Sequence, residues 1–404
     1  MTKKWVNIAD VLFFQEGPGV RNTQYTTSGV KLLNVANLVD GKVDLSKSDR
    51  YISEEEAYGK YRHFLCDDGD FVIASSGIKV EYIDKKMGFV DASMLPLCMN
   101  TSTIRFKVLD ENQLRIRYFM YYLKSKHFKE QLTKQITGSA QLNYGPSHLK
   151  KMIMPLIDIT VQDEIISCMD KLQSIIETRQ RELIELDRLT KARFVEMFGD
   201  PATNPYNWDK VNISEVVGDK VSNGFFAKRD DYADDGNVSV MGVAYIVNRM
   251  YSQWQDLPRT NGTDKDIEKF EVKYGDMLFC RSSLVAEGIG KASIVPEDVP
   301  QNTLFECHVI RLPLDLSKCV PEYMQVFSTM EYFRQQIIAQ SKTATMTTIG
   351  QDGILKADIL LPPMSKQREF YAFVHQVNKS KVAVQKALDE TQILFDSLMQ
   401  KYFG

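Results

Sequence analysis

Cysteine and histidine are scarce in this sequence, and neither is spaced as in a metal site. The 404 residues include 6 cysteines and 5 histidines, with no CxxC pair and no HxxxH or HxxEH spacing. Scattered thiols of this kind are typical of reduced cysteines in the cytosol. The sequence therefore predicts neither a zinc centre nor a disulfide framework.

Long apolar runs and low-complexity tracts are also missing. No stretch approaches the roughly 18 consecutive apolar residues that a membrane-spanning helix needs. The opening "MTKKWVNIADVLFF" has a short apolar run without a small-residue cleavage site, so we interpret it as mature sequence. A composition of 44% hydrophobic and 25% charged residues indicates a globular protein, and we expect a cytoplasmic location with no membrane partner.

Motifs that carry catalysis are missing as well. There is no GxxxxGK[ST] phosphate loop, and "GIGKAS" (288–293) lacks the third glycine of a dinucleotide fingerprint. The Asn/Asp-Pro-Pro-aromatic box of amino-methyltransferases is absent, because "NPYNW" (204–208) has one proline and "LPPM" (361–364) has no aromatic residue. A nuclease core could use the Glu-x-Lys triplet formed by Glu271 and Lys273, but such a triplet arises easily by chance on a polar strand. The sequence predicts a non-catalytic chain.

The chain does contain a repeat of itself. The Phe-Gly pair at 198–199 recurs at 403–404, which is 205 residues later, and the Gly-Asp pair at 69–70 recurs at 275–276. Small differences in spacing between such matches are what loop-length changes between two copies produce. The repeat predicts a duplication of about 200 residues, and this length fits two globular domains.

Each copy alternates short β-branched or aromatic runs with Gly, Asp and Asn, a pattern that predicts strands followed by helices. We expect one helix over 115–135 and its counterpart over 320–340. A short apolar stretch with proline then precedes the end of each copy. The expected strands are "GVKLLNV" (29–35), "GDFVIAS" (69–75), "TSTIRFKV" (101–108), "GDMLFC" (275–280) and "LFECHVIRL" (304–312).

A long helix is expected at the end of each copy. Apolar residues recur there with alternating four- and three-residue steps over about five heptads, which favours two helices packed on each other over two separate surface helices. A capping box at Thr160 and Asp163 and a start at Ser365 are the expected helix beginnings. The predicted seam contains Ile165, Met169, Leu172, Ile176, Leu183, Leu186, Val374, Val377, Val384, Leu388, Phe395 and Leu398.

Together these features predict a mixed α+β fold with an internal pseudo-two-fold duplication. We expect globular domains over 1–158 and 200–364, a central helix over 159–199 and a C-terminal helix over 365–404. Since the first helix leads directly into the second domain, an antiparallel helix pair would place the two domains at opposite ends.

Positive charge gathers before the first long helix. The net charge of −3 does not decide whether the chain binds a polyanion, but residues 113–152 hold eight lysines and arginines against Glu130 alone. Such a segment suits phosphate contacts, although a solvated helix face with buried tyrosines explains it equally well. The candidate DNA-binding residues are Lys79, Lys124, Lys126, Lys129, Lys134, Gln141, Asn143 and Tyr144 in the first copy, and Lys228, Arg229, Arg281, Ser282, Lys291 and Lys342 in the second.

Several phrases of the sequence resemble the specificity subunits of Type I restriction-modification systems. They are "GVKLLNVANLVDG" (29–41), "GDFVIASSG" (69–77), "TGSAQLNYGPSHLKKMIMPL" leading to a glutamine-containing helix start (137–164), and "FGDPATNP" (198–205). Each phrase is degenerate, but jointly and repeated they are specific, and the resemblance covers nearly the whole chain.

The resemblance implies a DNA reader without catalytic activity. Each globular domain would be a target-recognition domain for one half of an interrupted DNA sequence, and the paired helices would set the gap and dock methyltransferase subunits, two in number. S-adenosylmethionine, and ATP with magnesium, would then bind to the methyltransferase and restriction or translocase subunits, and this chain would hold no cofactor. The second copy departs from the pattern, because it has "KTATMTT" (342–348) where the first has its glycine-serine-glutamine loop.

Two other functions remain open from the residues. A coiled-coil adaptor would keep the same architecture and bind proteins only. A nuclease would use this chain as its DNA-recognition part. DNA binding that depends on salt and on sequence in the presence of a methyltransferase separates the first of these from a specificity subunit.

Overall fold

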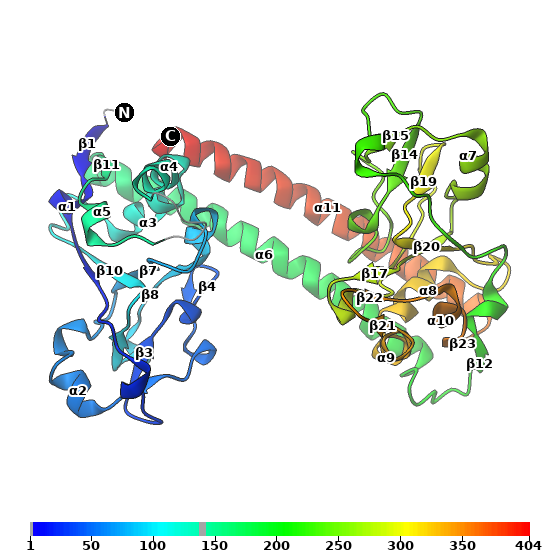
Figure 1. Ribbon diagram of the computed structural model, residues 1–404, viewed down its shortest axis with the longest axis horizontal. Helices are drawn as coiled ribbons and strands as arrows, with labels where there is room; N and C mark the ends of the chain where they lie inside the picture. The colour runs from blue at the N-terminus through cyan, green and yellow to red at the C-terminus, as the bar shows by residue number, and fades with distance from the viewer. Residues whose placement is uncertain (1–2, 137–142) are drawn as a thin grey trace. The chain divides into compact units, whose positions relative to one another are not determined.

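The computed structural model describes residues 3–136 and 143–404, which form two compact units. Unit 1 comprises Met1–Thr178 and Ala387–Gly404, and unit 2 comprises Arg179–Lys386. Both units combine strands with helices, so the predicted mixed α+β class is confirmed. Two long helices, α6 (Ile159–Phe198) and α11 (Met364–Phe403), each contribute one part to each unit (Figure 1).

Unit 1 is built around a four-stranded sheet of order β2-β10-β7-β8 and a three-stranded sheet of order β6-β3-β9, with β1-β11 and β4-β5 as additional pairs. Its strands are β1 (Lys4–Asn7), β2 (Leu12–Glu16), β3 (Val30–Leu33), β4 (Leu38–Val39), β5 (Lys42–Val43), β6 (Tyr51–Ile52), β7 (Phe71–Ala74), β8 (Met87–Phe89), β9 (Leu97–Met99), β10 (Thr103–Val108) and β11 (Ile153–Leu156). Its shorter helices are α1 (Ile8–Val11), α2 (Glu54–Tyr58), α3 (Ile116–Lys124), α4 (Lys126–Gln135) and α5 (Pro146–Leu149).

Unit 2 repeats this arrangement with the sheets β13-β20-β16-β18, β15-β14-β19 and β12-β23, and adds a three-stranded sheet, β17-β22-β21. Its strands are β12 (Asp209–Asn212), β13 (Ser222–Asn223), β14 (Val238–Met241), β15 (Arg259–Thr260), β16 (Met277–Cys280), β17 (Ser282–Ser283), β18 (Ala292–Ile294), β19 (Thr303–Phe305), β20 (Val309–Leu312), β21 (Lys342–Thr343), β22 (Thr347–Thr348) and β23 (Asp358–Leu361). Its shorter helices are α7 (Asp264–Phe270), α8 (Pro321–Ser328), α9 (Glu331–Ala339) and α10 (Gln351–Leu355).

The C-terminal end of each long helix packs into a hydrophobic core. This packing explains why the Phe-Gly pair occurs at the end of both helices. In unit 1, the Phe403 ring lies 5.0 Å from the Tyr118 ring, centroid to centroid. In unit 2, the Phe198 ring lies 4.9 Å from the Tyr323 ring. All four side chains are buried. Each repeated phenylalanine therefore ends a long helix inside an aromatic core.

A buried glutamine ties the start of each long helix to the preceding domain. Gln162 accepts a hydrogen bond from the Arg115 backbone N–H (2.9 Å) and donates to the carbonyl of Gln113 (2.8 Å). Gln367 makes the equivalent bonds in unit 2, to residues 205 positions further along. Because both glutamines have no exposed surface, these bonds satisfy groups that water cannot reach.

The repeated Gly-Asp pair forms a turn that places a carboxylate in each core. Gly69 and Gly275 have φ angles of +83° and +82°, a region that residues with a side chain rarely adopt. The carboxylate of Asp70 accepts a hydrogen bond from Arg105 (3.2 Å), whereas that of Asp276 lies 3.9 Å from the Arg311 Nε. The Gly-Asp pair is repeated because both turns require a residue with a positive φ angle at the first position.

The two long helices are packed together, as predicted, and within unit 2 they run antiparallel. Asp187 of α6 forms an ion pair with Lys381 of α11, and Arg193 forms one with Glu369 (3.7 Å). Residue numbers rise along one helix as they fall along the other. Of the predicted seam residues, Ile165, Met169, Leu172, Ile176, Val374, Val377 and Phe395 are buried, and Leu183, Leu186, Val384, Leu388 and Leu398 are half-buried.

Three local predictions are wrong. The helix expected over 115–135 is interrupted at Ser125, whose hydroxyl accepts a hydrogen bond from the Phe128 N–H (3.2 Å) and so caps α4. The run 304–312 is likewise split, between β19 and β20, and 320–340 is split between α8 and α9.

The expected helix beginnings also differ from the structure. Asp158, rather than Thr160, accepts the hydrogen bond from a first-turn N–H of α6 (2.9 Å). Helix α11 begins at Met364, so Ser365 lies inside its first turn and is not the capping residue. Since an aspartate and a threonine both cap helices well, pattern alone could not choose between neighbouring positions.

Candidate nucleic-acid interface

A small sheet of unit 2 brings together polar residues that are distant in sequence. In β17-β22-β21, Ser282 lies opposite Thr348, and Thr348 lies opposite Lys342. The hydroxyls of Thr343 and Thr347 are 3.0 Å apart. Hydroxyl groups donate and accept hydrogen bonds, and the lysine adds a positive charge, so this sheet can contact both phosphates and base edges.

Arg281 and His308 extend the polar surface beside β17. The Arg281 N–H donates to the His308 carbonyl (2.8 Å), and its guanidinium donates to the Cys307 carbonyl (3.1 Å). The His308 Nδ1 lies 3.0 Å from the Ser282 hydroxyl. Sequence patterns did not single out His308, because its position depends on the pairing of β16 with β20.

The loop that carries Lys228 and Arg229 starts beside the same region. A Cβ atom at Gly224 would lie 2.2 Å from the Glu306 carbonyl oxygen, so only glycine allows this close approach. Phe225 forms an isolated β-bridge with Glu306. The exposed side chains of Lys228 and Arg229 follow a few residues later. The structure thus brings the start of this loop next to the turn that precedes β20.

Lys291 lies elsewhere, in a recess of about 810 Å³ in unit 2. Its ammonium donates to the Asn248 side chain (2.7 Å). The one carboxylate of the recess, Asp187, is paired with Lys381, so the recess is electropositive. Sequence patterns missed it because its cations come from separate elements. The other cations that line it are Lys191, Arg249, Arg334 and Lys381.

Unit 1 has the equivalent of the β17–β22 pairing in a shorter form. Ser76 and Asn143 form an isolated antiparallel bridge at the position of Ser282 and Thr348. Asn143 and the nearby Lys79 are both exposed. The predicted base-contacting residue Gln141 lies outside the described residues. The structure therefore keeps Asn143 and Lys79 as candidates.

The prediction for Tyr144 is wrong. Its ring is buried, its hydroxyl donates to the Ala74 carbonyl (3.0 Å), and its N–H donates to the Ser75 carbonyl (3.0 Å). Burial raises the pKa of the Tyr144 hydroxyl well above its ordinary value. Tyr144 fixes the loop to the sheet, and its side chain is not available to DNA.

Much of the positive charge predicted for residues 113–152 is neutralised by carboxylates. Such pairs weaken the field that a phosphate would meet, although at exposed positions each pair adds little stability. Lys134, Lys150 and Lys151 are exposed. The ion pairs are Arg115 with Asp163 (2.8 Å), Arg117 with Asp170 (2.7 Å), Lys129 with Asp84 (3.1 Å) and Lys126 with Glu130 (3.7 Å).

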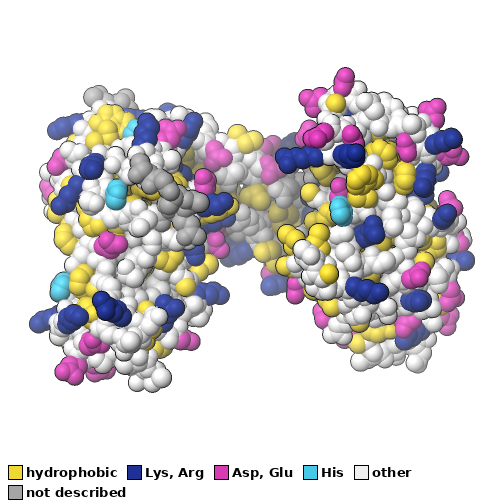
Figure 2. All heavy atoms as spheres, in the orientation of Figure 1, with side chains coloured by type: hydrophobic (Ala, Val, Ile, Leu, Met, Phe, Trp, Pro, Cys, Tyr) yellow, Lys and Arg dark blue, Asp and Glu magenta, His cyan; other side chains and the backbone are white. Residues whose placement is uncertain are grey.

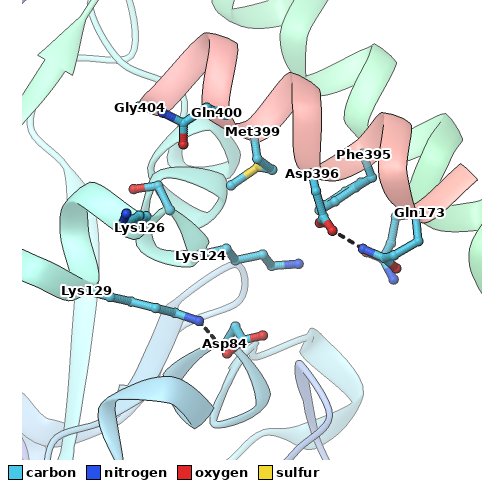
Figure 3. A pocket seen from close by; sticks show the side chains of 12 residues that line it. Asp84, Lys124, Lys126, Lys129, Gln173, Phe395, Asp396, Met399, Gln400 and Gly404 are labelled. Carbon is cyan, nitrogen blue, oxygen red and sulfur yellow. Dashed lines mark hydrogen bonds and ion pairs between the residues drawn. The ribbon is translucent and has the colours of Figure 1, made fainter. Parts of the chain in front are cut away.

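Lys124 is half-buried in unit 1 rather than fully exposed. It lines a recess of about 390 Å³. Figure 3 shows Lys129 turned toward Asp84 in this recess. The Lys124 ammonium lies 5.2 Å from the centre of the Tyr121 ring, and burial lowers the pKa of this ammonium. Lys124 and Lys129 are therefore weaker candidates for phosphate contacts than the exposed Lys134.

Over residues 3–136 and 143–404, no group of three or more His, Cys, Asp or Glu side chains is placed to hold a metal ion. Across the same described ranges, no helix combines the length and the apolar character needed to span a membrane. The candidate interface consists instead of hydroxyl, amide and basic side chains on loops and short strands.

The sequence and the fold both match known proteins. Residues 18–188 match the family described as Type I restriction modification DNA specificity domain. The Type I restriction enzyme MjaVIII specificity subunit of Methanocaldococcus jannaschii is 22% identical over 190 residues, which cover 46% of this chain and 43% of that protein. Over these residues the chain is similar to the Type I restriction-modification specificity subunits.

Solved structures of low sequence identity share the fold of this chain over its whole length. The S subunit of a Type I restriction-modification system from M. genitalium matches with a TM-score of 0.56 and 12% identity, covering 100% of this chain and 96% of that chain. A structure from work on complex assembly and conformational transition of the type I R-M system matches with a TM-score of 0.52 and 15% identity, covering 99% and 97%. At such identities the likeness concerns the fold alone.

Proposed function

We propose that this chain is a specificity subunit, the non-catalytic DNA reader of a Type I restriction-modification complex. Each unit contacts one half of an interrupted double-stranded DNA sequence through the polar surfaces described above. The duplicated residues 1–158 and 200–364 act as the two target-recognition domains. The segments 159–199 and 365–404 act as the spacer between them.

One observation carries the proposal: the two units share their scaffold but differ in their exposed loops. The buried glutamines Gln162 and Gln367 make equivalent hydrogen bonds, yet the bridge of Ser76 with Asn143 becomes a three-stranded sheet in unit 2. A chain that reads two different half-sites needs this combination, because a common scaffold positions the domains while different loops contact different bases.

The partners follow from the same role. Two DNA methyltransferase subunits would dock on the subunit and bind S-adenosylmethionine, and restriction or translocase subunits would use ATP with magnesium. This chain itself needs no cofactor to read DNA. The complex would work in the cytoplasm, where bacterial and archaeal DNA is found.

DNA binding by the complex of this chain with its methyltransferase tests the proposal. We expect affinity that depends on the DNA sequence and falls with salt concentration, because phosphate contacts release counterions. A chain that assembles with the methyltransferase but gives it no preference among DNA sequences would be a protein adaptor instead.

A further inference from the structure

Hydrophobic side chains lie exposed beside the polar sheet of unit 2. Leu284 directly follows β17 and is 82% exposed, and the next residue, Val285, is 59% exposed. Ser283, the last residue of β17, lies opposite Thr347, and the residue before Thr347 is Met346, which is 36% exposed. Figure 2 shows hydrophobic side chains at the surface of unit 2, with lysine and arginine side chains among them.

The turn that presents Leu284 is held in place by its own hydrogen bonds. The Ser283 hydroxyl accepts from the Val285 N–H (3.3 Å), and the Gly288 N–H donates to the Val285 carbonyl (3.1 Å). A Cβ atom at Gly288 would lie 2.1 Å from the Ser283 hydroxyl, so a side chain there would displace the hydroxyl that accepts from Val285. The exposure of Leu284 is therefore a feature of a defined turn, and a contiguous apolar patch of this kind indicates a binding surface.

The first copy does not have this feature. Ile78 stands where Leu284 stands in the second copy, and only 9% of its surface is exposed. Lys79, a charged residue, follows it in place of Val285. Leu284 and Val285, called the apolar tip below, thus belong to the part of the chain in which the two copies differ. The parts that differ are those that would read different DNA sequences.

The residues beside Leu284 and Val285 indicate which kind of ligand contacts this apolar tip. Ser282 and Lys342, on the same small sheet, suit contacts with base edges and phosphates, and Arg281 adds a second positive charge beside them. The one apolar group that a base pair displays in the major groove is the C5-methyl group of thymine. An apolar side chain among polar and basic ones therefore matches a thymine edge better than an extended hydrophobic protein surface.

We propose that Leu284, supported by Val285 and Met346, contacts the C5-methyl group of a thymine in the half-site that unit 2 reads. This inference rests on the proposed function and assigns one specificity-determining contact within it. Arg281, Ser282 and Lys342 position the loop on the duplex, and Leu284 distinguishes thymine from the other bases at one position.

The test compares thymine with uracil, which lacks only the methyl group. The full chain is purified with its methyltransferase, the methylated sequence is mapped, and each thymine of the second half-site is replaced in turn by deoxyuridine in a short duplex. We expect the wild-type complex to bind about fourfold more weakly at one such position, the ratio that burying one methyl-sized group gives. In the Leu284→Ser complex the thymine and uracil duplexes should bind equally, whereas Leu284→Met should restore the difference.

Two controls separate this effect from a general loss of binding. Ile393→Ser makes a comparable apolar-to-serine change at Ile393, which lies on α11 and is 69% exposed. This variant should leave the thymine preference unaltered. Uracil substitutions in the first half-site should act alike on the wild type and on Leu284→Ser. Because Leu284 is exposed, its replacement should not unfold the chain.

Three results would overturn the inference. The second half-site could contain no thymine that is sensitive to uracil, or the sensitivity could persist in Leu284→Ser. Leu284→Ser could instead lose its methyltransferase subunits in size-exclusion chromatography while keeping the thymine preference, which would make the tip a protein interface. A wild-type complex that binds all sequences equally would contradict the proposed function as well.

Discussion

At the scale of single residues, the two copies differ in the geometry of an equivalent buried pair of an aspartate and an arginine. The Asp70 carboxylate lies 3.2 Å from the Arg105 guanidinium, whereas the Asp276 carboxylate lies 3.9 Å from the Arg311 Nε, so the second carboxylate is less well compensated. Burial raises the pKa of Asp276 to about 6. A buried carboxyl whose pKa is raised binds its proton more tightly in the folded chain than in the unfolded chain.

This pKa predicts how stability changes with pH. Between pH about 4 and pH about 6 the folded state holds a proton that the unfolded state has lost, so Asp276 makes the free energy of unfolding fall as the pH rises. Asp276→Asn keeps an oxygen to accept from the Lys273 N–H and should remove this dependence, which amounts to about 2 kcal/mol across the window. Urea unfolding from pH 4 to 7 measures it, and parallel curves for variant and wild type would refute the assignment.

The exposed lysines of unit 1 make a second prediction at this scale. Replacing Lys134, Lys150 and Lys151 with glutamine should weaken DNA binding and lower its log-log salt slope by up to about one unit for each lost phosphate contact. Lys129→Gln is the control, since the Lys129 ammonium is already paired with Asp84. An unchanged slope in the triple variant would show that these lysines form only a solvated face.

Among the elements, the long helices contribute side chains to both hydrophobic cores. Phe403 ends α11 and is buried against Tyr118 and Tyr122, at ring distances of 5.0 Å and 6.3 Å. Phe403→Ala should lower the free energy of unfolding of unit 1 by about 3–5 kcal/mol. Hydrogen exchange should show the loss in unit 1 and not in unit 2. Ile393→Ala, at an exposed position of the same helix, should change stability by less than about 0.5 kcal/mol.

The local sequence pattern predicts the long helices well. It does not predict features that depend on contacts with residues distant in the sequence, such as a helix cap or the burial of a side chain. The long helices were expected over 159–199 and 365–404, within one residue of their observed bounds, because a heptad stripe is a local signal. The break at Ser125 was missed, since serine is tolerated in helices and only its hydrogen bond reveals a cap. Tyr144 was assigned to DNA because sequence gives no measure of burial for an amphipathic ring.

The candidate site shows the same division. Ser282 and Lys342 were expected, and the structure places them in one sheet, but the neighbouring His308 was not expected. Lys291 was expected and lies instead in a separate basic recess of unit 2. Residues of a site that come from separate elements carry no joint signal in the sequence until their strands are paired.

On the scale of the whole molecule, duplication is the central feature. The buried contacts are repeated between the units, and the exposed loops are not, which is the pattern expected of one scaffold that reads two different sequences. The solved S subunit structure from M. genitalium shares this fold across the full chain.

Mapping of methylated bases in DNA tests the account most directly. Long-read sequencing of cells that express this chain with its methyltransferase subunits reports every modified site. The account predicts a motif of two specified halves separated by unspecified base pairs, in which Leu284→Ser relaxes one half and leaves the other unchanged. A continuous motif without an unspecified gap, or methylation without sequence preference, would contradict it.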